Sequence, residues 1–133
     1  MGVRFFVDAG LGFRLVEGLR SLGYDNIEHI YEKFPIGTLD ETWLEYVGAN
    51  KLVVITKDKM IRKNPKEKAA LIKYGIIAFY LGGDKLSIRE MGSQLINSWE
   101  RMEACAIKQQ KKGVAGAFII RPRGGKIEEI PLT

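Results

Sequence analysis

The chain alternates short apolar runs with stretches of helical periodicity over most of its length. An apolar run at residues 3–7 is followed by leucines and valines at helical spacing, and the same exchange recurs along the chain. Strands that alternate with helices favour a parallel sheet, and right-handed crossovers leave few ways to arrange it. The pattern therefore predicts an α/β fold in which helices cover both faces of a central parallel sheet.

The individual elements follow from the same periodicity. Strands are predicted at residues 3–7, 26–31, 51–56 and 76–81, and helices at 11–22, 39–49, 65–75 and 88–112. In the last helix, Asn97–Ser98 suggests a break, and residues 117–121 and 127–130 predict a C-terminal β-hairpin around Pro122. We expect the strand order 2-1-3-4, in a three-layer, Rossmann-like arrangement.

Length and composition restrict the class of protein. The chain has 133 residues, 46% of them hydrophobic and 28% charged, which predicts one globular domain spanning residues 1–133. No apolar run approaches the roughly 20 residues of a membrane helix, and no secretory signal precedes the first strand, so a cytoplasmic location without membrane contact is expected. Cys105 is the only cysteine, which excludes an internal disulfide and a cysteine-based zinc site.

Acidic residues stand where predicted strands end and where one helix begins. Asp8 follows the first strand, Asp58 follows the third, and Asp40 with Glu41 opens the helix at 39–49. In the order 2-1-3-4, strands one and three are neighbours at the point where the winding reverses, so Asp8 and Asp58 should meet at its carboxyl edge. The loop before the helix should deliver Asp40 to the same edge.

A cluster of carboxylates has a chemical requirement of its own. Carboxylates a few Å apart repel one another, whereas a divalent cation allows all of them to ionise. All-oxygen ligands favour hard cations, so Mg²⁺ or Mn²⁺ suits this set better than zinc. Such an ion can activate water for phosphodiester cleavage without a histidine or cysteine nucleophile.

Positive charge gathers beside the predicted acidic site. The formal net charge is +5, and the densest basic stretch runs from residue 57 to residue 68. Basic side chains neutralise phosphates, so this stretch could hold a polyanion at the acidic site. The alternative is that these lysines are ordinary solvated surface charges. We predict RNA contacts from four basic residues of this stretch: Lys57, Lys59, Arg62 and Lys63.

Four short motifs follow one another in a defined order: Val7-Asp8 after a strand, Asp40-Glu41-Thr42-Trp43-Leu44 opening a helix, Thr56-Lys57-Asp58-Lys59 ending a strand, and Ser98-Trp99-Glu100-Arg101 before the hairpin. With these motifs the chain resembles the PIN-like toxins of the VapC group along almost its whole length. The resemblance implies a metal-dependent ribonuclease, usually the toxin of a toxin–antitoxin pair, whose acidic residues hold Mg²⁺ or Mn²⁺.

The resemblance also assigns roles by position. Asp8, Asp40 and Asp58 match the metal-binding acidic set, and Glu41 is a further catalytic candidate. Ala9 is a departure, because many relatives carry a larger polar residue there. The implied partners are an RNA substrate and a small antitoxin protein, for which Trp99 and the C-terminal helix offer an apolar surface. A second copy of the chain could use the same surface.

Two other functions and several structural roles stay open at this stage. In a receiver-type phosphoacceptor domain, Asp58 would be phosphorylated, but such domains usually place a second acid directly after the first, where Ala9 stands. A non-catalytic RNA-binding module is the other alternative. Structural readings also exist for single residues: Glu41 could cap its helix with Thr38, His29 is expected on the surface, and Trp43 and Trp99 are expected to be core or interface anchors rather than platforms for RNA bases.

Overall fold

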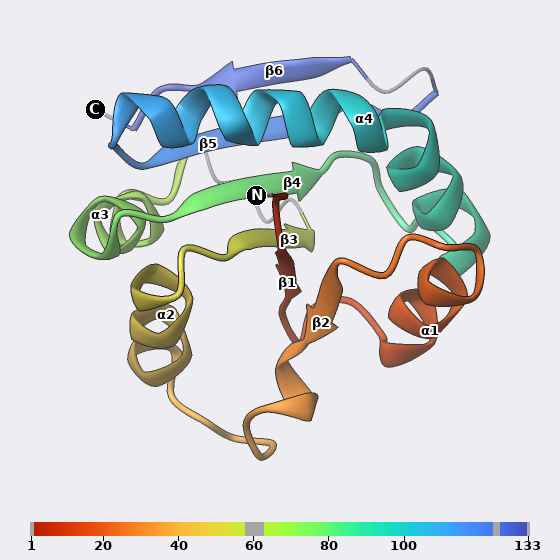
Figure 1. Ribbon diagram of the computed structural model, residues 1–133, viewed down its shortest axis with the longest axis horizontal. Helices are drawn as coiled ribbons and strands as arrows, with labels where there is room; N and C mark the ends of the chain where they lie inside the picture. The colour runs from red at the N-terminus through yellow and green to blue at the C-terminus, as the bar shows by residue number, and fades with distance from the viewer. Residues whose placement is uncertain (1, 58–62, 124–125, 133) are drawn as a thin grey trace.

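The computed structural model describes residues 2–57, 63–123 and 126–132. One sheet has the strand order β2-β1-β3-β4-β5-β6, in which only β6 is antiparallel to its neighbour (Figure 1). The strands are β1 (Phe5–Val7), β2 (Ile27–His29), β3 (Val53–Lys57), β4 (Ile77–Leu81), β5 (Gly116–Ile120) and β6 (Ile127–Ile130). The helices are α1 (Phe13–Ser21), α2 (Asp40–Ala49), α3 (Pro65–Tyr74) and α4 (Ile88–Lys112), with a 3₁₀ turn, η1, at Ile30–Glu32.

The predicted order 2-1-3-4 is confirmed, and it places β1 between two parallel neighbours. Val7, the last residue of β1, pairs with His29 of β2 on one side and with Ile55 of β3 on the other. The C-terminal hairpin is confirmed as well. It continues the sheet, because β5 pairs in parallel with β4 and β6 then forms the far edge.

The two faces of the sheet have separate cores. Phe5 of β1 points to the face covered by α1 and α4, where Trp99 packs edge-on against it with ring centroids 4.9 Å apart. Phe6 points to the opposite face, where Trp43 of α2 stacks on it at 5.6 Å. Both tryptophans are therefore core anchors, which is one of the two roles that the sequence predicted. In Figure 1, α2 and α3 stand beside each other at one side of the sheet.

The long helix α4 is continuous, so the predicted break at Asn97–Ser98 is wrong. Ser98 is completely buried within the apolar stripe, and the Asn97 side chain bonds the Ser93 hydroxyl one turn earlier. Asn and Ser cost less than about 1 kcal/mol each in a helix interior, which burial of the stripe outweighs. The Ser87–Glu90 capping box starts the helix as predicted, and Gly113 ends it in a left-handed conformation.

Two further expectations are corrected around α2 and β2. The N-cap of α2 is Leu39, and it makes no side-chain cap bond. Thr38 instead donates its hydroxyl to the carbonyl of Pro35 at 2.7 Å, so Thr38 and Glu41 form no capping box. His29 is 1% exposed rather than on the surface, because the start of α1 and η1 fold over the edge strand that carries it.

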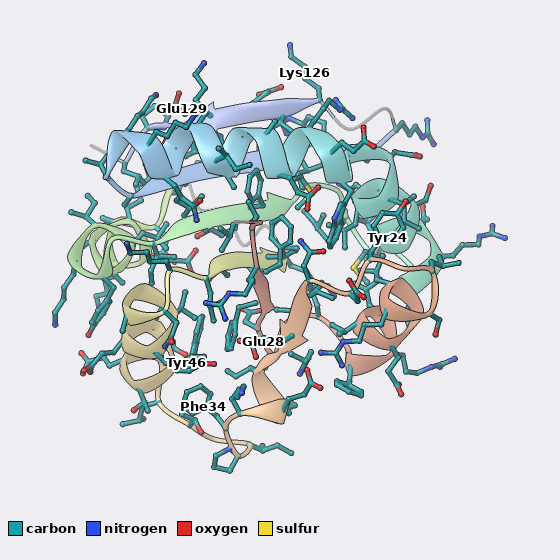
Figure 2. All side chains as sticks on the ribbon, in the orientation of Figure 1. Tyr24, Glu28, Phe34, Tyr46, Lys126 and Glu129 are labelled. Atoms are coloured by element: carbon teal, nitrogen blue, oxygen red, sulfur yellow. The ribbon has the colours of Figure 1, made fainter. Side chains whose placement is uncertain are left out.

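The loop between η1 and α2 is anchored by aromatic packing. Phe34 packs edge-on against Tyr46 of α2 with centroids 5.3 Å apart, and the Tyr46 hydroxyl donates to Glu28 of β2 at 3.3 Å (Figure 2). Burial and the neighbouring Glu28 carboxylate raise the pKa of Tyr46, so its hydroxyl stays a donor.

Among the described residues, no helix is long and apolar enough to cross a membrane.

Candidate active-site cleft

A cleft of about 710 Å³ opens over the sheet face that α2 and α3 cover. It begins at the carboxyl edge of β1 and β3 and extends between the two helices. Four acids reach it from three different segments, and lysines reach it from one helix wall. The polar residues that line it are Asp8, Thr38, Asp40, Glu41, Thr56, Asn64, Lys66, Glu67 and Lys73.

Asp8 lies directly after β1 and is half-buried. Its Oδ1 accepts a hydrogen bond from the Gly10 backbone N–H at 3.0 Å, and its Oδ2 accepts one from the Thr56 hydroxyl of β3 at 2.8 Å. A Cβ on Gly10 would lie 3.2 Å from Oδ1, so glycine lets the loop close around the carboxylate. These two bonds fix the orientation of the Asp8 carboxylate at the end of β1.

Asp40 and Glu41 form the first turn of α2 and are exposed to solvent. Asp40 Oδ1 accepts from the indole N–H of Trp43 at 3.1 Å. Because Trp43 stacks on Phe6 of β1, the Asp40 carboxylate is held relative to the strand that carries Asp8. Glu41 does not cap the helix, which removes the structural reading that competed with a functional one.

Glu67 is an acid of the cleft that sequence reasoning did not select. Asn64 caps α3 by accepting from the Glu67 backbone N–H at 3.1 Å, and Pro65 begins the helix. The buried Tyr80 hydroxyl of β4 donates to Glu67 Oε2 at 2.8 Å. Asn at the cap with Glu three residues later is a recognisable start signal, and it could have placed Glu67 at the carboxyl edge.

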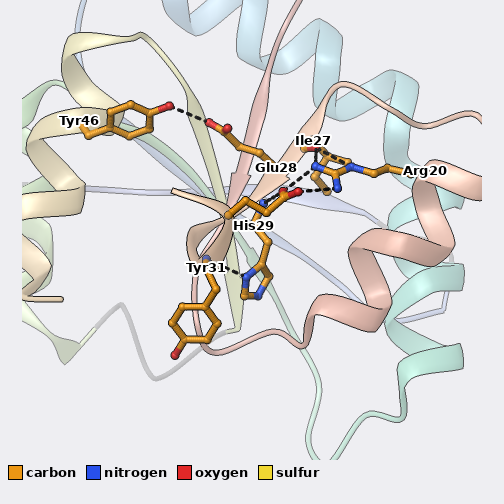
Figure 3. Close-up of polar contacts among 7 residues, drawn as sticks. Arg20, Ile27, Glu28, His29, Tyr31 and Tyr46 are labelled. Atoms are coloured by element: carbon orange, nitrogen blue, oxygen red, sulfur yellow. Dashed lines mark hydrogen bonds and ion pairs between the residues drawn. The ribbon is translucent and has the colours of Figure 1, made fainter. Parts of the chain in front are cut away.

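His29 ties together two segments that border the cleft, and Figure 3 shows its contact with one of them, at Tyr31. Its Nδ1 accepts from the backbone N–H of Tyr31 at 3.2 Å, and its Nε2 lies 2.8 Å from the carbonyl oxygen of Leu11. An Nδ1 that accepts an N–H is unprotonated, so the neutral ring carries its proton on Nε2 and donates it to Leu11. The loop after Asp8 is thereby fastened to the turn that contains Tyr31.

A solvent-exposed ion pair supports the junction of α1, β2 and η1. Arg20 of α1 donates to both oxygens of Glu32, at 2.6 Å and 2.9 Å, and also to the carbonyl of Ile27. Glu32 in turn accepts from the backbone N–H of His29 at 2.9 Å. The hydrogen bond from Arg20 is the main reason that the pKa of Glu32 lies below its ordinary value.

The lysines that line the cleft are not the residues that were predicted to contact RNA. Lys57 and Lys63 are exposed and do not line the cleft, whereas Lys66 and Lys73 of α3 do line it. The other predicted contacts, Lys59 and Arg62, lie outside the described residues. Of the two lysines that line the cleft, Lys66 was counted only as part of the basic run and Lys73 was not considered, because sequence alone does not show which side of α3 faces the sheet.

The three aspartates predicted as metal ligands are only partly placed. Asp8 and Asp40 line one cleft together with Glu41. Asp58 lies outside the described residues, so its approach to Asp8 stays a prediction. Among the residues that are described, no three His, Cys, Asp or Glu side chains are close enough to hold a metal ion.

The fold places acids at the carboxyl edge of a mostly parallel sheet, and lysines of α3 line the same cleft. Residues 3–83 match the model of the PIN-like domain family, and the chain belongs to this family. The match runs from β1 to just after β4 and includes every acid of the cleft, whereas α4 and the hairpin lie beyond it. No curated protein and no solved structure matches the chain.

Proposed function

We propose that the protein is a metal-dependent endoribonuclease that cleaves RNA phosphodiesters in the cleft. The observation that carries this proposal is the arrival of Asp8, Asp40 and Glu41 in one cleft at the switch point of a PIN-like sheet. Ligands of open α/β sheets bind at this point. Lys66 and Lys73 on the adjacent wall supply the charge that a phosphate backbone requires.

The proposed cofactor is Mg²⁺ or Mn²⁺, held by Asp8 and Asp40 with Asp58 as the third ligand. The donor set consists of carboxylate oxygens alone, which suits a hard cation. When bound, such an ion activates water and stabilises the leaving oxygen.

The chain's own groups would orient the reactants. Thr56 and the Gly10 backbone N–H fix the rotation of the Asp8 carboxylate, and Trp43 fixes that of Asp40. Glu41 is exposed at the start of α2 and is the proposed acceptor of the proton from the attacking water. The lysines of α3 would hold the phosphates on either side of the bond that is cut.

A toxin role within a toxin–antitoxin pair is the finer proposal, and it is supported by the resemblance to the VapC group. The partners would then be RNA and a small antitoxin, with a homodimer as a further assembly. Trp99 is 4% exposed and packs on Phe5, so it is not available as the apolar surface for a partner. Along α4, the exposed large apolar residues are Ile88 and Ile107.

The test is RNA cleavage by purified protein with added Mg²⁺ or Mn²⁺. Asp8→Asn and Asp58→Asn should each abolish cleavage while RNA binding and the melting temperature change little. Lys126→Gln, on the hairpin away from the cleft, is the control and should cleave normally. Wild-type rates in both aspartate variants would overturn the proposal.

Two other functions are separated by simple measurements. Membership of the PIN-like family favours a nuclease over a receiver-type phosphoacceptor, and labelling of Asp58 by acetyl phosphate would reverse this preference. Calorimetry that finds no Mn²⁺ site, together with salt-sensitive RNA binding, would identify a non-catalytic RNA-binding module instead.

A further inference from the structure

A second hollow, here called the hairpin groove, lies between α4 and the C-terminal hairpin. It is open to solvent, has a volume of about 620 Å³ and lies on the face of the sheet opposite the acidic cleft. All of its lining residues follow residue 83, where the match to the PIN-like family ends. The family relationship therefore assigns no role to this groove.

One wall of the hairpin groove is a stripe along α4. Arg101, Ala104, Cys105 and Lys108 line it, and their spacing places them on one face of the helix. Arg101 and Lys108 are both exposed and lie about 10 Å apart along the helix axis. Between them, the small Ala104 and the half-buried Cys105 leave an apolar stretch, which Ile127 of β6 continues.

The hairpin groove carries more positive than negative charge. Lys126, just before β6, adds a third cation to the two of α4, and Glu129 adds one acid. In the part of the chain that the structure describes, the side chains of Lys108 and Lys126 form no hydrogen bond or ion pair. Burial and then Glu129 raise the pKa of Cys105, while Lys108 acts in the opposite direction, so these charges surround the thiol.

The strand beside the groove has an open edge. β6 is the outermost strand of the described sheet, and Figure 2 shows Lys126 and Glu129 along it, beside α4. The carbonyl of Lys126 accepts a backbone hydrogen bond from the residue after β5 at 2.8 Å. Because antiparallel hydrogen bonds alternate, Glu128 and Ile130 bond to β5 next. The backbone groups of Ile127 and Glu129 therefore point to the open edge.

We infer that the hairpin groove and the open edge of β6 bind an extended, acidic segment of a partner protein. The segment adds a strand to the sheet through main-chain hydrogen bonds to Ile127 and Glu129. Side chains of a strand alternate between its two faces, so every second side chain of the segment faces α4. Carboxylates at these positions meet Arg101, Lys108 and Lys126. The inference does not depend on the proposed nuclease function.

Two other occupants fit the same observations less well. An RNA strand would be attracted by the lysines, but Glu129 repels phosphates and the open strand edge has the hydrogen-bond spacing of a peptide. A second copy of the chain that paired along most of β6 would set glutamates opposite each other, and like charges in opposite positions are destabilising.

A peptide of defined sequence tests the charge complementarity. A fluorescein-labelled octapeptide of alternating glutamate and valine should bind the protein at low salt, measured by fluorescence anisotropy. The matching octapeptide of lysine and valine should not bind. Lys108→Gln/Lys126→Gln should weaken binding of the acidic peptide at least tenfold. Lys66→Gln/Lys73→Gln removes the same charge from the acidic cleft and should leave this affinity unchanged.

A pair of substitutions at one position tests the strand edge. Glu129→Pro removes a backbone N–H that does not bond to β5, and proline is tolerated at such positions of edge strands. It should weaken peptide binding at least tenfold, whereas Glu129→Gln removes only the repelling charge and should bind at least as tightly as the wild type. Methylating the backbone nitrogens of the peptide tests the same bonds without altering the protein, and should also weaken binding at least tenfold.

Cys105 reports where the peptide binds. It is the only thiol of the chain and lines the hairpin groove, so saturating peptide should slow its alkylation by iodoacetamide at least tenfold. Protection by polyuridylate but not by the peptide would make the groove an RNA site, and the inference would fail. It would also fail if the peptide did not bind and Glu129→Pro dissociated a dimer seen by light scattering.

The remaining outcomes separate this inference from the proposed function. Equal affinity of the acidic peptide for the wild type and for Lys108→Gln/Lys126→Gln would overturn the inference, as would the absence of any binding. RNA cleavage by Lys108→Gln/Lys126→Gln should match that of the wild type, because neither lysine lines the acidic cleft. A protein that binds the peptide in the groove but cuts no RNA would support the inference and defeat only the nuclease proposal.

Discussion

At the scale of single residues, the hydrogen bond between Thr56 and Asp8 joins the two central strands at the cleft. Thr56 is 7% exposed, and its hydroxyl has one acceptor within 2.8 Å, the Oδ2 atom of Asp8. A hydrogen bond to a charged group contributes about 1.5–3 kcal/mol. Thr56 is therefore a positioning residue for the proposed metal ligand, and no strand propensity requires a hydroxyl at this position.

Replacing Thr56 by valine removes the donor and keeps the shape. We expect Thr56→Val to lower kcat for RNA cleavage roughly 10-fold or more, in line with the loss of a charge-assisted hydrogen bond, and to weaken Mn²⁺ binding measured by calorimetry. Thr56→Ser retains the hydroxyl and should restore both. If the valine variant cleaves RNA and binds Mn²⁺ as well as the serine variant, the hydroxyl does not orient Asp8.

The residues that sequence reasoning found and missed differ in one physical respect. Asp8 follows a strand that is apolar throughout, so its place at a sheet edge is fixed by the period of the strand. Glu67 and His29 depend on contacts with distant segments, namely the Tyr80 hydroxyl and the Leu11 carbonyl. The sequence around a single polar residue does not reveal a hydrogen-bond partner in a distant segment. A histidine on a predicted edge strand is therefore expected to be exposed on the surface.

At the scale of elements, the approach of α2 to α3 depends on Gly48. Alanine is favoured over glycine by about 1 kcal/mol inside a helix, but here its Cβ would meet a backbone oxygen at 2.4 Å. A backbone atom cannot rotate away, so the helices must separate. The cost of such overpacking is about 1–3 kcal/mol, which exceeds the gain in propensity.

We therefore expect Gly48→Ala to lower the free energy of unfolding by about 1–2 kcal/mol in urea denaturation. Gly18→Ala is the control, because Gly18 lies inside α1 with nothing within 4 Å of its added Cβ. That variant should gain up to about 1 kcal/mol. A stabilised Gly48→Ala protein would show that the two helices are not in contact at this point.

The junction of α1, β2 and η1 carries a pH dependence. The pKa of Glu32 is lowered from its ordinary 4.5, first by the hydrogen bond from Arg20 and then by the His29 backbone N–H. A carboxyl whose pKa is lower in the folded state stabilises the protein above its unfolded value, and this contribution is lost as the pH falls through the folded value. The junction should thus weaken below about pH 4.5.

Thermal unfolding measured between pH 7 and pH 3 checks this expectation. Glu32→Gln should be less stable than the wild type at pH 7, by up to about 1 kcal/mol because the pair is partly exposed. Below the folded pKa the two proteins should converge. Glu17→Gln is the control, because Glu17 also lies in α1 but does not accept this hydrogen bond. This variant should follow the wild type throughout. A constant difference between wild type and Glu32→Gln at all pH values would contradict the assigned cause.

The order of the elements was predictable because it depends on periodicity, which the sequence contains in full. The alternation of period 2 and helical spacing, with right-handed crossovers, leaves the order 2-1-3-4 as the expected one. Helix starts were less predictable. Thr38 with Glu41 has the spacing of a capping box, yet Thr38 bonds Pro35 and α2 begins one residue later. The hydrogen bond from Thr38 to Pro35 determines where α2 begins, and the spacing of Thr38 and Glu41 does not reveal this bond.

At the scale of the whole molecule, positive charge lies both in the acidic cleft and away from it. The formal net charge is +5, and the cleft that holds four acids is also lined by two lysines of α3. Further lysines, Lys111 and Lys112, end α4 far along the chain. RNA affinity falls with salt in proportion to the number of phosphates neutralised, so the salt dependence identifies which lysines contact RNA.

The last prediction compares two double variants by that dependence, with single-stranded RNA and no added metal. If Lys66 and Lys73 each neutralise one phosphate, Lys66→Gln/Lys73→Gln should reduce the slope of log affinity against log salt by about 1.4, since each contact to a single strand contributes about 0.7. Lys111→Gln/Lys112→Gln removes the same charge and should shift the affinity slightly without changing the slope. If the two double variants reduce the slope equally, RNA binding depends on the net charge of the protein alone. A loss of slope confined to a Lys57→Gln/Lys63→Gln protein would instead place the strand along the exposed basic run, outside the cleft, because charge acts on the slope only where a phosphate is bound.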